Sequence, residues 1–234
     1  MSRKYDSRTT TFSPEGRLYQ VEYAMEAISH AGLTLGIMAS DGIALVAVRR
    51  KISGTLEEPH QVGHLVAAVA GLTADANILV KEARSKSLEY WRSFSSNIPI
   101  ELLVQRIGNL KQGFTQMGGL RPFGVSLLYA GYDKSLGFQL YHSDPSGNYS
   151  AWKATAVGAQ SQAAQSFLKN EFSEGLSLVE VKDLAFRTLR HVLIGDEEEA
   201  NNEEDDIKAG DPTNADTMDE LDLSDIVATG MFWF

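Results

Sequence analysis

Few residues in this chain of 234 residues have the type and spacing that could do chemistry. The absence of cysteine excludes disulfides, thiolate metal sites and a cysteine nucleophile. His60 and His64 have the four-residue spacing of a helical metal site, but the neighbouring Pro59 and Gly63 favour a loop. The sequence has no phosphate-binding loop, dinucleotide fingerprint or HExxH motif. We therefore predict no metal, no cofactor and no catalytic site of these types.

Composition and charge indicate which classes of partner, such as membranes or nucleic acids, the chain is suited to bind. Hydrophobic residues make up 43% of the chain, which is ordinary for a folded protein. No apolar run approaches the length needed to span a bilayer. The net charge of −10 disfavours nucleic acid, and the eight carboxylates of residues 196–206 supply much of it. We expect no membrane and no direct nucleic-acid partner, and the lack of cysteine suits a reducing compartment.

The elements that could position functional residues begin with a turn and an amphipathic helix. Pro14 fixes its own backbone angle φ and, with Ser13 and Gly16, favours a turn. Behind it, apolar residues recur every three or four positions, as on one face of a helix. These residues are Leu18, Val21, Met25 and Ile28. The pattern alone predicts a helix that covers its own domain, preceded by flexible residues 1–12.

The rest of the chain has strands and helices in separate runs. Asp41-Gly42 between two short apolar runs predicts a hairpin. Helices are expected to begin at Thr73, Pro99, Ser161 and, behind a capping box, Ser177. Strands are expected at 65–70, 124–130, 138–142, 151–157 and 226–234. Because the strands do not alternate with helices, we predict the α+β class.

The last part of the chain is acidic. Residues 195–225 have few apolar side chains, and we predict a solvated or disordered insert there. It would interrupt a single domain of residues 13–234. The apolar end at 231–234 should be buried or lie in an interface.

Several stretches of the chain resemble one family. Residues 12–24 read Phe-Ser-Pro-Glu-Gly-Arg-Leu-Tyr-Gln-Val-Glu-Tyr-Ala, which resembles the signature of proteasome alpha-type subunits. Further matching stretches are 38–42, 70–76, 118–124 and 143–149. The resemblance covers residues 2–194, and residues 5–8 and 27–32 resemble the third position of the eukaryotic alpha ring.

The resemblance implies both a fold and a lack of catalysis. The implied fold is a four-layer αββα sandwich of the N-terminal nucleophile hydrolase type. Catalytic relatives use a threonine at the start of the first core strand, activated by its own amine. The nucleophile position falls on Gly32 and the supporting acid on Val48, and Thr34 is expected to be a strand residue. The chain would therefore be a non-catalytic subunit of a threonine-protease complex.

The resemblance also implies a gating role for the first residues. In the family, seven alpha subunits form each outer ring of the 20S core particle, and their N-termini gate the pore through which unfolded substrate enters. The matching residues are Tyr5, Asp6, Ser7, Arg8 and the turn residue Pro14. Ser7 stands where the family usually has arginine, so the charge-assisted hydrogen bonds of that arginine cannot form from this position.

A docking site for the C-terminal tails of activators is implied at Leu18, Gly32 and Leu72, hereafter the tail-docking site. In the family, a lysine at this site pairs with the terminal carboxylate of the tail. We find no counterpart of that lysine, because the stretch from Leu56 to Val66 is shorter than in the family. We therefore expect weak docking of activator tails at this subunit.

The implied partners are the other alpha subunits of a seven-membered ring, the beta-ring subunits, and the regulatory particle or other activators. The implied setting is ATP- and ubiquitin-dependent protein degradation in the cytoplasm and nucleus. Two alternatives stay open. One is an active N-terminal nucleophile hydrolase processed near Gly32, whose mature chain would begin near Leu33 or Thr34. The other is an adaptor whose acidic residues 196–206 recruit basic partners.

Overall fold

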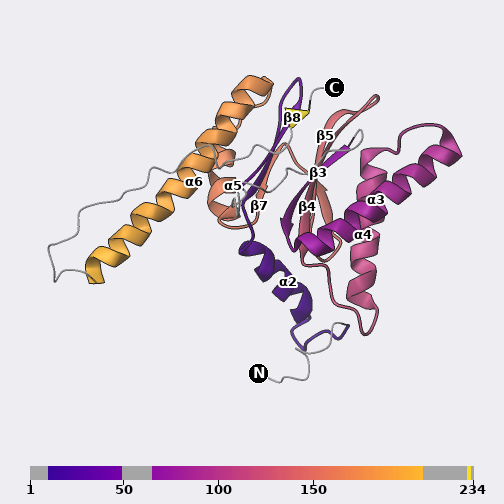
Figure 1. Ribbon diagram of the computed structural model, residues 1–234, viewed down its shortest axis with the longest axis horizontal. Helices are drawn as coiled ribbons and strands as arrows, with labels where there is room; N and C mark the ends of the chain where they lie inside the picture. Colours follow the sequence, from indigo (N-terminus) through magenta and orange to yellow (C-terminus); the bar gives the residue numbers. More distant parts are fainter. Residues whose placement is uncertain (1–9, 49–64, 208–230, 233–234) are drawn as a thin grey trace, which may run out of the picture.

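The computed structural model describes residues 10–48, 65–207 and 231–232. Within these ranges the chain forms two four-stranded antiparallel sheets and five helices, arranged as Figure 1 shows. The sheets lie between two pairs of helices, and a further helix lies near the N-terminus. This combination of helices and antiparallel sheets agrees with the predicted α+β class.

The first sheet is built around the predicted hairpin. Its strands, in spatial order, are β7 (Ala154–Val157), β1 (Thr34–Met38), β2 (Ile43–Ala47) and β8 (Met231–Phe232). The turn between β1 and β2 is closed by the N–H of Ala39, which donates to the carbonyl oxygen of Gly42 at 2.8 Å. The hairpin is therefore confirmed. Of the expected last strand, residues 226–230 and 233–234 lie outside the described ranges.

The second sheet is an antiparallel meander. Its strands are β3 (Leu65–Gly71), β4 (Val125–Asp133), β5 (Gly137–Ser143) and β6 (Tyr149–Ala151). The prediction of one strand over 151–157 is wrong, because the chain changes sheets at Trp152 and Lys153. The N–H of Trp152 donates to Leu140 of the second sheet at 2.9 Å, and the carbonyl of Lys153 accepts from Met38 of the first at 2.7 Å.

The helices begin close to their predicted positions. They are α2 (Tyr19–Ser29), α3 (Thr73–Phe94), α4 (Ile100–Gln116), α5 (Ser161–Glu171) and α6 (Leu178–Ile207). The capping box before α6 is confirmed, because the Glu180 carboxylate accepts the N–H of Ser177 at 2.7 Å. Thr73 is not the N-cap of α3: that position is taken by Leu72, which has no side-chain oxygen to accept a hydrogen bond.

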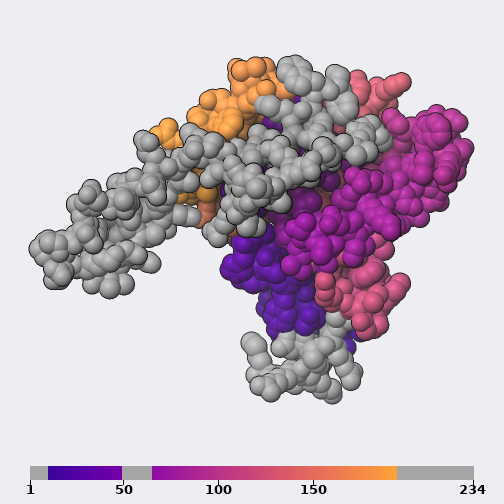
Figure 2. All heavy atoms as spheres, in the orientation of Figure 1, coloured from indigo at the N-terminus to yellow at the C-terminus, as the bar shows by residue number. Residues whose placement is uncertain are grey.

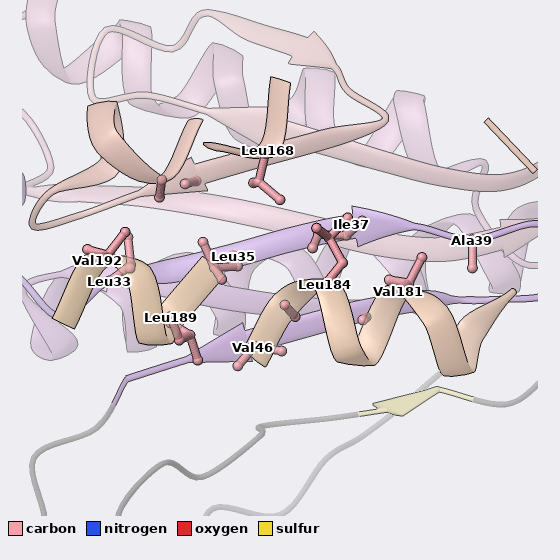
Figure 3. Packing of buried hydrophobic residues seen from close by; sticks show 14 of the residues in the cluster. Leu33, Leu35, Ile37, Ala39, Val46, Leu168, Val181, Leu184, Leu189 and Val192 are labelled. Carbon is pink, nitrogen blue, oxygen red and sulfur yellow. The ribbon is translucent and has the colours of Figure 1, made fainter. Parts of the chain in front are cut away.

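Three apolar clusters hold these elements together. Helices α5 and α6 pack on the first sheet, and Figure 3 shows Leu35 and Ile37 of β1 within this cluster. Both residues are fully buried. Helices α3 and α4 pack on the second sheet through Leu79, Leu103 and Ile107. Residues from both sheets, and Ile28 of α2, form the third cluster between the sheets. Each fully buried leucine or isoleucine contributes roughly 1.5–3 kcal/mol to folding.

Helix α6 continues into the acidic segment. Its backbone is helical to Ile207, so residues 195–207 differ from the expectation of irregular structure. Glutamate and alanine favour helix, and a helix that has already nucleated extends at little cost. In Figure 1 this part of α6 extends away from the sheets. Residues 208–225, the rest of the predicted insert, lie outside the described ranges.

Candidate functional site

The turn before α2 is closed by hydrogen bonds around Ser13, which is 5% exposed. Its N–H donates to the carbonyl of Arg17 and its own carbonyl accepts from Gly16, both at 2.9 Å. The Ser13 hydroxyl oxygen also accepts the N–H of Arg17 at 3.2 Å. The predicted turn is confirmed, and Pro14 lies exposed on it. The other residues assigned to gating, Tyr5, Asp6, Ser7 and Arg8, lie outside the described ranges, so their role stays a prediction.

Helix α2 buries one face and leaves another in solvent. Val21 and Ile28 are 6% and 4% exposed, while Met25, from the same predicted stripe, is 47% exposed. Tyr23 on the outward side is 49% exposed. The helix lies against strands β3 and β4, and Figure 2 shows it, in indigo, at the surface of the molecule. An exposed face with large apolar side chains is suited to contact with another protein.

The three residues of the tail-docking site do not form one cluster within the chain. Leu18 precedes α2 and Gly32 follows it, so the two are separated by the length of an eleven-residue helix, about 16 Å. Leu72 stands at the start of α3 and is 51% exposed. A site that used both Leu18 and Gly32 of one chain would have to extend along the whole of α2.

The entrance to strand β1 is closed by backbone. A Cβ atom on Gly32 would lie 2.5 Å from the carbonyl oxygen of Val48, closer than such atoms approach. A Cβ on Gly158, where φ is +102°, would meet the carbonyl oxygen of Gly32. Position 32, the counterpart of the nucleophile, thus has no room for a side chain unless the backbone moves. Thr34 is 1% exposed, and its hydroxyl donates to the carbonyl of Val69 at 3.3 Å, so it is a strand residue as predicted.

A buried cluster of polar residues was not predicted from the sequence. Lys111 of α4 is 0% exposed, and its Nζ donates to the carbonyls of Val125 and Ser143 at 3.1 and 3.4 Å. It also donates to the Ser143 hydroxyl at 2.9 Å, which lies 3.1 Å from the hydroxyl of Tyr129. Burial lowers the pKa of the Lys111 ammonium to about 7, and the nearby Asp144 opposes that shift.

A lysine beside a serine hydroxyl can activate it as a nucleophile. Here both residues are 0% exposed, so no substrate reaches the Ser143 hydroxyl. The three acceptors match the three N–H groups of an ammonium ion. The cluster therefore fastens α4 to strands β4 and β5, and it has a structural role.

The described residues contain no group of three His, Cys, Asp or Glu side chains placed to hold a metal ion. His30 lies near Glu26 at 3.6 Å, and His191 stacks on Phe167. Burial lowers the pKa of His142, and its Nε2 has no hydrogen-bond partner within the described ranges. His60 and His64 lie outside them. In the same part of the chain, no helix combines the length and apolar character of a membrane span.

Comparison with known proteins gives two adjoining matches to families. The family defined by the N-terminal signature of the proteasome A-type subunits matches residues 5–27, and the proteasome subunit family matches residues 28–208. The chain is 57% identical over 200 residues to the proteasome alpha type-4-2 subunit of Oryza sativa subsp. indica, across 82% of this chain and 80% of the relative. It is 54% identical over 195 residues to the proteasome alpha type-3 subunit of Saccharomyces cerevisiae, across 80% and 76%.

Proposed function

The chain belongs to the proteasome alpha-type subunits, and from this we propose that it is a non-catalytic structural and gating subunit of the alpha ring of the 20S core particle. The observation that carries the proposal is the match of the alpha N-terminal signature to residues 5–27. That segment includes the turn at Ser13 and most of α2, whose outward face is exposed to solvent in this chain. An exposed face of this kind is suited to contact with a neighbouring subunit in a ring.

The backbone packing at the start of strand β1 supports a lack of catalysis. The nucleophile of the catalytic relatives would stand at Gly32, where the carbonyl oxygen of Val48 leaves no room for a side chain. Val48 at the position of the supporting acid has no ionisable group. We infer that the two sheets and their helices form the four-layer αββα sandwich of the N-terminal nucleophile hydrolases, without their chemistry. The helices that pack on each sheet support this inference.

The gate, in this proposal, is formed by Tyr5, Asp6, Ser7 and Arg8, held in place by the turn at Pro14. Ser13 and Gly16 close that turn by hydrogen bonds, which supports a defined turn at Pro14. Leu18 and Gly32 lie at opposite ends of α2, which is consistent with a tail-docking site shared between adjacent subunits. Docking there is weak, because the chain lacks a counterpart of the pocket lysine.

The proposed partners are the other alpha subunits of a seven-membered ring, the beta-ring subunits, and the regulatory particle or other activators. The chain would serve ATP- and ubiquitin-dependent protein degradation in the cytoplasm and nucleus. Nothing in its composition favours a nucleic acid or a membrane as a further partner.

Native mass spectrometry of the complex isolated from its source tests the proposal. We expect the chain in a particle with six other alpha subunits and with beta subunits.

Removal of residues 1–9 should raise the hydrolysis of small peptides by that particle severalfold, because it removes part of the gate, and should leave the subunit composition unchanged. A lone monomer, or a truncated particle with unchanged hydrolysis, would contradict the structural or the gating role respectively.

The alternative of an active hydrolase makes a different prediction about mass. Processing near Gly32 would release a mature chain that starts at Leu33 or Thr34. Thr34 is buried, and its hydroxyl is bound to Val69, which argues against this alternative. An intact mass that includes the first 31 residues would exclude it.

A further inference from the structure

Two oppositely charged side chains join the start of helix α3 to the loop before strand β4. Asp75, in the first turn of α3, is 4% exposed. Arg121 donates through Nη1 to Asp75 Oδ2 at 2.6 Å and through Nη2 to Oδ1 at 2.9 Å. The N–H of Gly124 also donates to Oδ2, at 3.0 Å. The hydrogen bond from Arg121 lowers the pKa of Asp75, so the carboxylate stays ionised in this two-point contact.

The loop held by this ion pair contacts Leu72 directly. The N–H of Leu72 donates to the carbonyl of Gly124 at 2.9 Å. A Cβ on Gly124 would lie 2.9 Å from Cδ1 of Leu72, so the leucine side chain packs on bare backbone. The preceding Gly71 has φ of +125°, and a Cβ there would meet the same carbonyl of Gly124. The place of Gly124 therefore sets where the Leu72 side chain lies.

Leu72 is held in this way although it is 51% exposed. The Arg121 side chain is 62% exposed but Asp75 is buried, so the pair also compensates the charge of a buried carboxylate. These contacts fix an apolar side chain at the surface, where another molecule can reach it.

We propose that Asp75 and Arg121 are positioning residues of the tail-docking site, where they hold Leu72 for contact with an apolar side chain of an activator tail. This inference rests on the proposed function, which assigns Leu72 to that site. We assign Arg121 a role through Leu72, because its Nη1 and Nη2 each donate to Asp75 and Nη1 also donates to the carbonyl of Pro122.

The test uses core particles assembled with variant chains and a short synthetic peptide that has apolar residues, a photo-crosslinker and a free C-terminal carboxylate. The readout is the peptide concentration that gives half-maximal cross-linking to this chain. We expect Arg121→Met to raise it about tenfold, the loss typical of one binding contact. Arg121→Lys should give a smaller rise, because lysine keeps the charge but not the two-point contact.

The matched control is Arg187→Met. Arg187 is also an exposed arginine, and it pairs with Asp183 and Glu171 at 3.0 Å. Because it lies on α6, away from the Leu72 contacts, its loss should leave cross-linking unchanged. Should Arg121→Met fail to assemble, Arg121→Lys and Asp75→Asn decide the question in its place.

Leu72→Ala separates this inference from the proposed function. If Leu72→Ala leaves cross-linking unchanged, Leu72 is not part of the tail-docking site and that part of the proposed function fails. If Leu72→Ala weakens cross-linking but Arg121→Met does not, only the positioning role fails. The double variant Leu72→Ala/Arg121→Met should bind as weakly as Leu72→Ala alone. A further loss in the double variant would mean that Arg121 touches the tail itself and would overturn the inference.

Discussion

At the scale of single residues, Lys111 shows how this chain uses a charge in its core. Its ammonium is surrounded by acceptors from Val125 and Ser143, and no bulk water reaches it. Burial of a charge costs free energy unless hydrogen bonds replace the lost water. These hydrogen bonds offset part of the cost of burying the charge. The part that they do not offset disfavours the charged form, and the pKa of Lys111 is lowered for this reason.

The lowered pKa of Lys111 predicts how stability depends on pH. Because the pKa is about 7 in the folded state and 10.5 as the ordinary value, the unfolded chain binds more protons between these values. The free energy of unfolding should therefore rise, by up to a few kcal/mol, as pH increases from 7 to 9. Lys111→Met should remove this rise, as measured by chemical unfolding at several pH values.

The control for this experiment is Lys86→Met, because Lys86 lies on the surface and its ion pair with Glu89 raises its pKa. That variant should keep the slope of the parent chain between pH 7 and 9. An equal slope for Lys111→Met and the parent chain would show that Lys111 is charged at all of these pH values.

The burial of Lys111 could be predicted from the sequence, whereas its hydrogen-bond partners could not. Lys111 follows Ile107 by four residues, so helical periodicity places it on the buried face of α4. The acceptors come from residues far along the chain, Val125 and Ser143, and no local pattern pairs them with Lys111.

At the scale of elements, the close approach of β1 to its neighbours explains why Gly32 and Gly158 are glycines. The N–H of Val48 donates to the carbonyl of Leu33, and the N–H of Ala159 to that of Ala31, both at 2.8 Å. These bonds bring three stretches of backbone together at the entrance to β1. Local sequence predicted the hairpin, because Asp-Gly marks its turn, but it did not predict this third stretch.

The crowding at this entrance predicts the effect of adding one methyl group. Gly32→Ala should lower the free energy of unfolding by roughly 1–3 kcal/mol, because its Cβ would meet the carbonyl oxygen of Val48. Gly113→Ala is the matched control: its Cβ would meet only Cε of Met117 at 3.8 Å, an ordinary contact. In helix α4, that change should stabilise by up to about 1 kcal/mol. Equal midpoints of urea unfolding for the two variants would contradict this account.

At the scale of the whole molecule, the sequence predicted the class of fold but not its layers. The separate runs of strands and helices indicated α+β, and the structure agrees. The layers depend on contacts between distant segments, such as Ile28 of α2 with Leu128 of β4 and Leu140 of β5 in the cluster between the sheets. The change of sheet at Trp152 and Lys153 was missed for the same reason, since an apolar run does not reveal which sheet it joins.

The acidic segment distinguishes a ring subunit from an adaptor. Among the side chains that the structure describes, the core contacts of α6 include Val192 and Leu193, and the eight carboxylates of residues 196–206 follow in the sequence. Replacing these eight by the matching amides keeps the chain length and the core residues Val192 and Leu193. We expect incorporation into the ring, measured by native mass spectrometry, to match that of the parent chain. If the segment also recruits partners, basic proteins that co-purify with the parent particle should be lost from the variant particle, because amides carry no charge to attract them. Failure of the variant to enter the ring would show that the segment contributes to assembly itself.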